Sequence, residues 1–405
     1  MQVTFLIGNG FDLNLGLKTH FKDFITNYTE SDTTDDNIRA FRNIIDKDKN
    51  TWASAELAFG QYTDNNLWND IELDAELYSD CHEDFCMKLG DYLQKQERRL
   101  NYDLVQDELA KRFIHAIQSF TSGFKDVPRR QIQEKIDSYT GGFVYNFINF
   151  NYTETLDRCL SRGKVIQDNI GLRKHRNTTY VSSIGKHYHV HGYTNRGNMV
   201  LGVNDESQIK NVALFENKGE EFINQIIKIK ANEMNEENTD VNVHNLLKNS
   251  DLFYIYGMSI GETDALWWQR IIDVLNSKSN AIVIIHCFDA PTDSYLQRKI
   301  QTFKRERVEK FLAYSNLDNA RKAQLKSRIY IDTSNIFKTL HNLVDSELND
   351  PDIINLEIIN SSELNKIAKD TKELLNSGAL DDIKHLVQNK DMRNAIEIAN
   401  KVKLK

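Results

Sequence analysis

The sequence has 405 residues, of which 40% are hydrophobic, so the chain is long enough to bury a large core and to form more than one domain. Its net charge of -8 argues against non-specific binding to nucleic acid, because proteins of that class carry a surplus of Lys and Arg. The four cysteines form no C-x-x-C pair and no apolar run approaches about 18 residues, which excludes a zinc ribbon, a disulfide framework and a membrane span.

The first predicted element is a buried parallel strand at residues 3–7. No signal-peptide n-region precedes it, so a cytoplasmic protein without a membrane partner is expected. The strand runs into Gly8-Asn9-Gly10, and residues 21–28 then repeat apolar side chains at helical spacing. A strand, a glycine loop and a helix are typical of the opening of a nucleotide-binding α/β unit, because glycine lets the backbone approach a pyrophosphate and donate amides to it.

A second interpretation of this loop stays open. The third glycine of G-x-G-x-x-G is missing, and Asp12 would repel a phosphate if its carboxylate pointed inward. The loop is then a tight strand-to-helix turn that needs glycine for a positive φ. Asp12 in turn either contacts a ribose hydroxyl or caps a helix.

Residues 38–136 show mostly helical spacing of their apolar side chains, which predicts a large helical insertion between the first and second strands. The second strand covers residues 143–150, and Asn151 follows it directly. Ligands of α/β proteins bind at the carboxyl ends of parallel strands, so Asn151 is a candidate site residue. Three more β-rich segments are predicted, at residues 164–166, 187–192 and 199–203.

The α/β pattern continues with an apolar strand at residues 252–256, a buried strand at residues 281–288 and a last strand at residues 328–331. The first of them ends in a second glycine loop that contains Gly257 and Ser259 and leads to Asp264. Strands that alternate with helices predict an α/β domain over residues 1–345, with a parallel sheet covered by helices on both faces. Residues 346–405 show only helical patterns and are predicted to form an appendage that caps the core or binds a partner.

Four strand ends carry distinctive motifs: Gly8-Asn9-Gly10, Asn151-Tyr152, His191-Gly192 and the loop at residues 257–261. Taken together they resemble the SIR2-like superfamily, and their order and spacing are similar to those of the AbiH family of bacteriophage abortive-infection proteins. The run at residues 8–19 carries most of the resemblance. The resemblance spans roughly residues 1–345 and leaves the helical insertion and the appendage uncovered.

The resemblance implies a Rossmann-like domain that binds NAD or a related adenine nucleotide. It implies that the glycine loop holds the pyrophosphate and that Asn151 and His191 flank the nicotinamide ribose. Ser259 matches a serine that approaches a ribose or a phosphate, and Asp264 either contacts a ribose hydroxyl or caps a helix. The implied nucleotide-binding residues are Gly8, Asn9, Gly10, Asp12, Gly257, Ser259 and Asp264.

The chain departs from the superfamily pattern in three places. The usual Gly-Ala-Gly is Gly8-Asn9-Gly10, and the usual Asn-Tyr-Asp is Asn151-Tyr152-Thr153, so that a carboxylate is missing at Thr153. The zinc-binding cysteines of the protein deacylases are absent, which argues against protein deacetylation. No metal is therefore expected from this resemblance.

The chemistry predicts roles for two of these residues. Cleavage of the nicotinamide–ribose bond passes through an oxocarbenium-like state, as glycoside cleavage does. Asn151 would orient the attacking water or the carboxamide, and His191 would exchange a proton near neutral pH. Structural alternatives stay open: Asn151 as the cap of the next helix, His191 as a hydrogen-bonded structural residue and Ser259 as part of an ordinary turn.

A rival pattern lies in the same region. His187, His189 and His191 alternate, so on a strand all three side chains would face the same way and form a metal patch. Such a patch favours a metal-dependent hydrolase or nuclease, although the sequence indicates no carboxylate partner for it.

The leading hypothesis is an antiphage abortive-infection effector that binds NAD and hydrolyses it to nicotinamide and ADP-ribose. The alternative from another class is a nucleotide-sensing module without turnover, whose helical appendage binds a partner. A homo-oligomer is expected, with a phage-derived trigger or a second defence protein as the further partner.

Overall fold

The fold is described from a computed structural model. The structure describes residues 1–48, 55–69, 71–100, 102–166, 170–194, 197–216, 218–236, 238–291 and 297–341. The chain divides into two units, Met1–Leu343 and Val344–Lys405. The predicted appendage at residues 346–405 lies outside the described residues.

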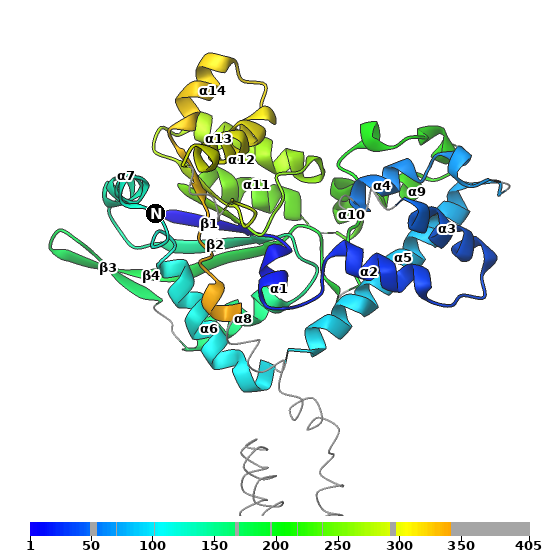
Figure 1. The fold of residues 1–405 in the computed structure, drawn as a ribbon, viewed down its shortest axis with the longest axis horizontal. Coiled ribbons are helices and arrows are strands. Elements are labelled where there is room, and N and C mark those ends of the chain that lie inside the picture. Colours follow the sequence, from blue (N-terminus) through cyan, green and yellow to red (C-terminus); the bar gives the residue numbers. More distant parts are fainter. Residues whose placement is uncertain are drawn as a thin grey trace, which may run out of the picture. The chain divides into compact units, whose positions relative to one another are not determined.

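A seven-stranded sheet forms the centre of the first unit (Figure 1). Its strands in spatial order are β3 (Gly171–His175), β4 (Thr178–His189), β2 (Val144–Asn149), β1 (Gln2–Ile7), β5 (Leu252–Tyr256), β6 (Ile282–His286) and β7 (Ile329–Asp332). Six strands are parallel and β3 alone is antiparallel, to its neighbour β4. The predicted parallel sheet is therefore a mixed sheet, because a hairpin at one edge adds an antiparallel strand.

The two faces of the sheet are covered by different helices, as the alternation of side chains along β1 requires. Leu6 faces the core beneath α11 (Thr239–Asn249), α12 (Ala265–Ser277) and α13 (Gln297–Ala313). Phe5 points to the other face, where its ring lies 5.4 Å from that of Phe147 and 6.3 Å from that of Phe120, just after α6 (Tyr102–Gln118). Figure 1 shows α11–α13 on one side of the sheet and α6 and α8 (Thr155–Ile166) on the other.

Helices between β1 and β2 occupy two places rather than one. One group, here called the helical lobe, has its own aromatic core and lies beside the carboxyl ends of the strands (right in Figure 1). The helical lobe contains α2 (Phe21–Glu30), α3 (Asp36–Lys47), α4 (Ala55–Gln61) and α5 (Ala75–Arg98). Two short helices from between β4 and β5, α9 (Glu220–Asn224) and α10 (Lys228–Met234), complete it. In contrast, α6 packs on the sheet and α7 (Asp126–Asp137) precedes β2. The segment predicted as an insertion, residues 38–136, thus contributes both to the helical lobe and to a face of the sheet.

Several predicted segments differ from the structure. Residues 164–166 end α8 instead of forming a strand, and residues 199–203 contribute only the isolated bridge between Val203 and Ile227. The hairpin of β3 and β4 was not predicted in full, because an edge hairpin with one exposed face lacks the continuous apolar run of a buried strand. The remaining elements are α1 (Gly10–Asn14), α14 (Asn319–Lys326) and the 3-10 turns Asn65–Leu67, Glu206–Gln208, Val212–Phe215 and Glu262–Asp264.

Two glycine loops, after β1 and after β5, pack directly against each other. The Gly8 N–H donates to Tyr256 O at 2.9 Å and the Gly10 N–H donates to Gly257 O at 2.8 Å. A Cβ at Gly10 would lie 2.4 Å from Gly257 Cα, and Gly257 itself has φ +68°. Gly8 and Gly10 are not among the residues with positive φ, so they are needed for close approach of the two loops.

Gly10→Ala is therefore expected to lower the free energy of unfolding by about 1–3 kcal/mol, the usual cost of overpacking a well-packed site. Urea unfolding of the full chain measures the change. Gly90→Ala in α5 is the matched control, because its Cβ would meet only Met199 Sδ at 3.5 Å. Alanine inside a helix should raise the unfolding free energy by about 0.5–1 kcal/mol. Equal effects of the two substitutions would contradict this account of the loops.

Candidate active site

A cavity of about 490 Å³ lies between the carboxyl ends of the central strands and the helical lobe. Parallel strands end at one edge, and the register of β1 places Ile7 level with Asn149 of β2 and Tyr256 of β5, so the loops that follow converge there. All nine residues predicted for the site line this cavity: Gly8, Asn9, Gly10, Asp12, Asn151, His191, Gly257, Ser259 and Asp264. Segments far apart in the sequence thus meet at one edge of the sheet, as the strand-tip motifs predicted.

Asn151 presents an unpaired amide to the cavity. The residue is 5% exposed, and neither Oδ1 nor Nδ2 has a hydrogen-bond partner in the described part of the chain. Helix α8 begins only at Thr155, so the alternative in which Asn151 caps that helix is wrong. Burying an amide without hydrogen-bond partners costs about 1–3 kcal/mol of folding free energy. An unpaired amide in this position is typical of a group that hydrogen-bonds to a ligand.

His191 lies just beyond the end of β4, with its ring near those of Phe150 and Tyr152 at 5.6 and 5.9 Å. Its Nε2 has no hydrogen-bond partner among the described residues and lies 3.7 Å from Asp264 Oδ1. Burial, with the nearby Lys228 ammonium, lowers the pKa of His191 to about 3. The imidazole is therefore neutral at pH 7, and the prediction that His191 exchanges a proton near neutral pH is wrong.

A buried ionic cluster, which was not predicted from the sequence, lies behind His191. Lys228 of α10 donates from Nζ to Glu56 Oε2 at 2.6 Å and to Thr263 O at 3.1 Å, and Nζ lies 3.7 Å from Asp264 Oδ1. The Tyr152 hydroxyl donates to Glu56 Oε1 at 3.1 Å. Glu56 and Lys228 belong to the helical lobe and are 172 residues apart, so no local pattern could have linked them.

The two carboxyl groups of this cluster differ in pKa. Burial alone would raise the pKa of Glu56, but Lys228 and His191 outweigh it and the pKa is lowered. Burial raises the pKa of Asp264 to about 6, with Lys228 opposing and Glu56 adding to the rise. Asp264 occupies the N-cap position of α12 but makes no capping hydrogen bond with its side chain. Asp264 is therefore the carboxyl group in this cluster that titrates near neutral pH.

Asp12 is a structural link rather than a free ligand. It is 1% exposed, and its carboxylate accepts hydrogen bonds from the hydroxyls of Thr153, at 2.5 Å, and Thr155. These bonds join α1, which follows the glycine loop, to the start of α8. The motif lacks a carboxylate at Thr153, and the carboxylate of Asp12 from α1 lies beside Thr153 instead.

The glycine loop that was predicted to hold the pyrophosphate has fewer free hydrogen-bond donors than expected. The N–H groups of Gly8 and Gly10 are already used between the two loops. The Asn9 side chain is held by Thr19, whose hydroxyl donates to Asn9 Oδ1 at 2.5 Å. Among the described residues the N–H groups of Asn9 and Ser259 have no partner and remain available to a ligand.

Two cations at the cavity wall were missed by the sequence analysis. Arg307 and Lys310 of α13 line the cavity, and Arg307 pairs with Asp289. Their helix lies far along the sequence from the glycine loops, so only the tertiary structure brings positive charge to this site.

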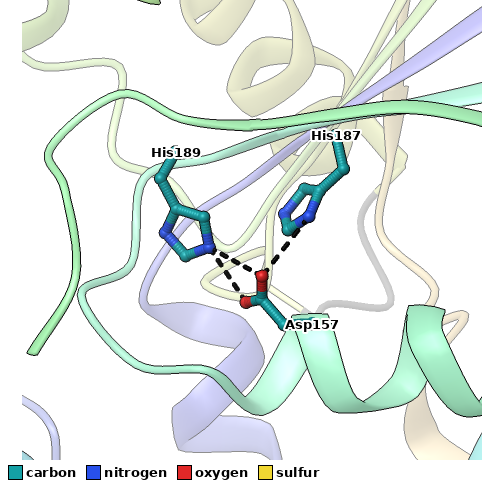
Figure 2. Close-up of side chains that lie close together, drawn as sticks. All are labelled: Asp157, His187 and His189. Atoms are coloured by element: carbon teal, nitrogen blue, oxygen red, sulfur yellow. Dashed lines mark hydrogen bonds and ion pairs between the residues drawn. The ribbon is translucent and has the colours of Figure 1, made fainter. Parts of the chain in front are cut away.

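A second cluster of polar side chains lies outside the cavity (Figure 2). His187 and His189 face the same way from β4, as predicted, and Asp157 of α8 provides the carboxylate that the sequence did not indicate. His191 is not part of this cluster, because β4 ends at His189 and the chain then turns toward the cavity. The predicted three-histidine patch is wrong in this respect.

A family model described as "Bacteriophage abortive infection AbiH" matches residues 4–286. The chain belongs to the AbiH family. The match runs from β1 to the end of β6 and so includes Asn151, His191, Asp264 and both glycine loops. Membership implies a role in bacteriophage abortive infection. No curated protein matched the chain. Within the described ranges, no helix of this AbiH protein has the length and apolar character needed to cross a membrane.

Proposed function

We propose that this AbiH protein binds NAD in the cavity and hydrolyses it to nicotinamide and ADP-ribose. The observation that carries the proposal is the convergence of the unpaired Asn151 amide, His191 and Asp264 on one cavity. Buried polar groups without partners, beside a carboxyl group of raised pKa, are typical of catalytic sites.

The strand order supports a dinucleotide as the ligand. The six parallel strands run β4-β2-β1-β5-β6-β7, which is the order of doubly wound folds that bind dinucleotides where the strand order reverses. The cavity lies next to β1, at that reversal. This order favours the Rossmann-like, SIR2-like assignment.

The size and charge of the cavity suit the same class of ligand. A volume of about 490 Å³ falls in the usual range for small-molecule sites. The unpaired N–H groups of Asn9 and Ser259, with Arg307 and Lys310 nearby, offer donors and positive charge for a pyrophosphate.

The chemistry follows from the protonation states. Ionised Asp264 would accept a proton from water while the oxygen bonds to ribose C1′ and the C1′–N bond breaks, with its electron pair going to nicotinamide. Nicotinamide leaves as a neutral molecule, so no acid is needed. The Asn151 amide would orient the water or the carboxamide, and neutral His191 would hydrogen-bond the ribose or the water. The rings of Phe150 and Tyr152 give the cavity an apolar wall beside His191.

The test is to incubate the full chain with NAD, alone and with extract from phage-infected cells, and to follow release of nicotinamide and ADP-ribose. Asn151→Ala should lower the rate by about 10²–10³-fold, as loss of one positioned polar group does in other enzymes. Binding of NAD or ADP-ribose without product under both conditions would favour the sensing module instead. The proposal is overturned if the chain neither binds NAD nor releases product under either condition.

A further inference from the structure

The cluster of Asp157, His187 and His189 is built by two elements that are held in fixed register. In the pairing of β4 with β2, His187 lies opposite Phe147 and His189 opposite Asn149. Both imidazoles therefore point to the face of the sheet that α8 covers, and Asp157 comes from the first turn of α8. Figure 2 shows the three side chains converging on one point.

The distances fit a set of metal ligands. His189 Nε2 lies 2.9 Å from Asp157 Oδ2, and His187 Nδ1 lies 3.4 Å from Asp157 Oδ1. All three possible ligand atoms lie within 4.8 Å of one another. Ligands of a tetrahedral zinc ion, with bonds of about 2.0–2.2 Å, are about 3.3 Å apart, so small side-chain movements would admit an ion.

The close contact of His189 with Asp157 favours a positive charge at this point. Its Nδ1 lies 3.2 Å from Asn151 O and its Nε2 lies 2.9 Å from Asp157 Oδ2, and both of these oxygens only accept. The one donor near the ring is the Asn149 amide, whose Nδ2 lies 3.4 Å from Nε2, farther than Asp157 Oδ2. A neutral imidazole has one N–H, so one ring nitrogen would face an oxygen with its lone pair. A proton or a metal ion at Nε2 removes this conflict.

The position of His187 favours a metal ion over a proton. With a proton on His189, His187 has only a long contact from Nδ1 to Asp157 Oδ1, at 3.4 Å, whereas an ion between the three side chains uses both imidazoles and the carboxylate. Nδ1–H of His189 would then donate to a backbone carbonyl, which is the usual arrangement behind a metal-bound histidine. Two imidazoles and one carboxylate suit zinc and its neighbours better than magnesium or calcium.

We propose that Asp157, His187 and His189 bind one divalent transition-metal ion of the zinc class. The side chain of Asp157 is 33% exposed, which leaves room for a water as the fourth ligand. Through the hydrogen bond from His189 to Asn151 O, the ion positions the segment that carries the Asn151 amide. The inference does not depend on NAD hydrolysis, because metal binding is measured directly.

The experiment uses the full chain, purified without a histidine tag, stripped with a chelator and titrated with Zn²⁺ or Co²⁺. One ion per chain is expected, with the intense visible absorption of tetrahedral cobalt and a rise in the thermal midpoint, since a ligand that binds only the folded state stabilises it. Asp157→Asn and His189→Ala should weaken binding by more than about 100-fold, because loss of even an outer partner costs about 10–100-fold.

Two variants serve as controls. His191→Ala should keep full metal binding, which separates this site from the three-histidine patch. His115→Ala, which removes an exposed histidine of α6, should also leave metal binding unchanged. Binding far below one ion per chain, or binding that Asp157→Asn leaves unchanged, would overturn the inference. If Asp157→Asn does not fold, the cobalt spectrum of the unmodified chain decides. Absence of the tetrahedral cobalt absorption would also overturn the inference.

Discussion

Asp264→Asn is expected to lower the rate of nicotinamide release by about 10²–10⁴-fold, the usual contribution of a general base. Asparagine has nearly the same shape but accepts no proton, and it stays next to His191 Nε2, which lies 3.7 Å from Asp264 Oδ1 in the structure. Binding of NAD, measured by calorimetry, should change much less than the rate. A large loss of binding with an unchanged rate constant would instead make Asp264 a binding residue.

The pH dependence gives a second measure of the role of Asp264. Burial raises its pKa from 3.8 to about 6, so the base form accumulates and activity should rise as the pH increases through about 6. The same shift acts on stability in the opposite direction. A carboxyl group with a raised folded pKa contributes stability below 3.8, and this contribution is lost as the pH rises through about 6. Asp264→Asn should abolish the rise in activity.

Glu262→Gln is the matched control for this substitution. It removes the same charge two residues away, but Glu262 is exposed and does not line the cavity. Its rate and pH profile should match those of the unmodified chain. If Glu262→Gln shifts the pH profile as Asp264→Asn does, the profile reflects general electrostatics and not one base.

Lys228→Met is expected to lower the free energy of unfolding by about 3–5 kcal/mol at pH 7, the cost of removing one partner from a buried ion pair. Lys228 is 6% exposed and is the cation between Glu56 and Asp264. Methionine keeps most of the side-chain volume, so the loss is chiefly electrostatic. Urea unfolding provides the measurement.

Two comparisons make this prediction specific. Lys230→Met, in the same helix α10, breaks only an exposed pair with Glu233 and should cost about 0–1 kcal/mol. Adding Glu56→Gln to Lys228→Met removes one of the two uncompensated carboxylates and should recover part of the lost stability. A Lys228→Met variant as stable as Lys230→Met would show that the cluster carries no such energy.

The position of the ionic cluster links stability to the proposed chemistry. Glu56 and Lys228 come from the helical lobe, whereas Asp264 and His191 follow strands of the sheet. Lys228 keeps the lobe and the sheet together and also opposes the rise in the pKa of Asp264. The helical lobe is thus one wall of the site and part of its electrostatics.

Local sequence was sufficient for the central strands and their tips. Runs such as residues 3–7 and 252–256 consist of apolar, aromatic or β-branched residues because the strands are buried on both faces, and this pattern is visible in the local sequence. Since parallel strands end at one edge, the motifs after them could be placed together: Asn151, His191 and Asp264 line one cavity. The sequence motifs also predicted the AbiH family, which the family match confirms.

The tertiary structure decided the partners of these residues. Glu56 and Lys228 meet behind His191, Asp12 accepts from Thr153 and Thr155, and Asp157 joins two histidines of β4, all across long sequence separations. Burial and these neighbours, rather than residue type, make His191 neutral and leave Asp264 to titrate near pH 6. Periodicity in a sequence reports which side of an element is apolar, but a pKa and an ionic contact depend on what packs against that side.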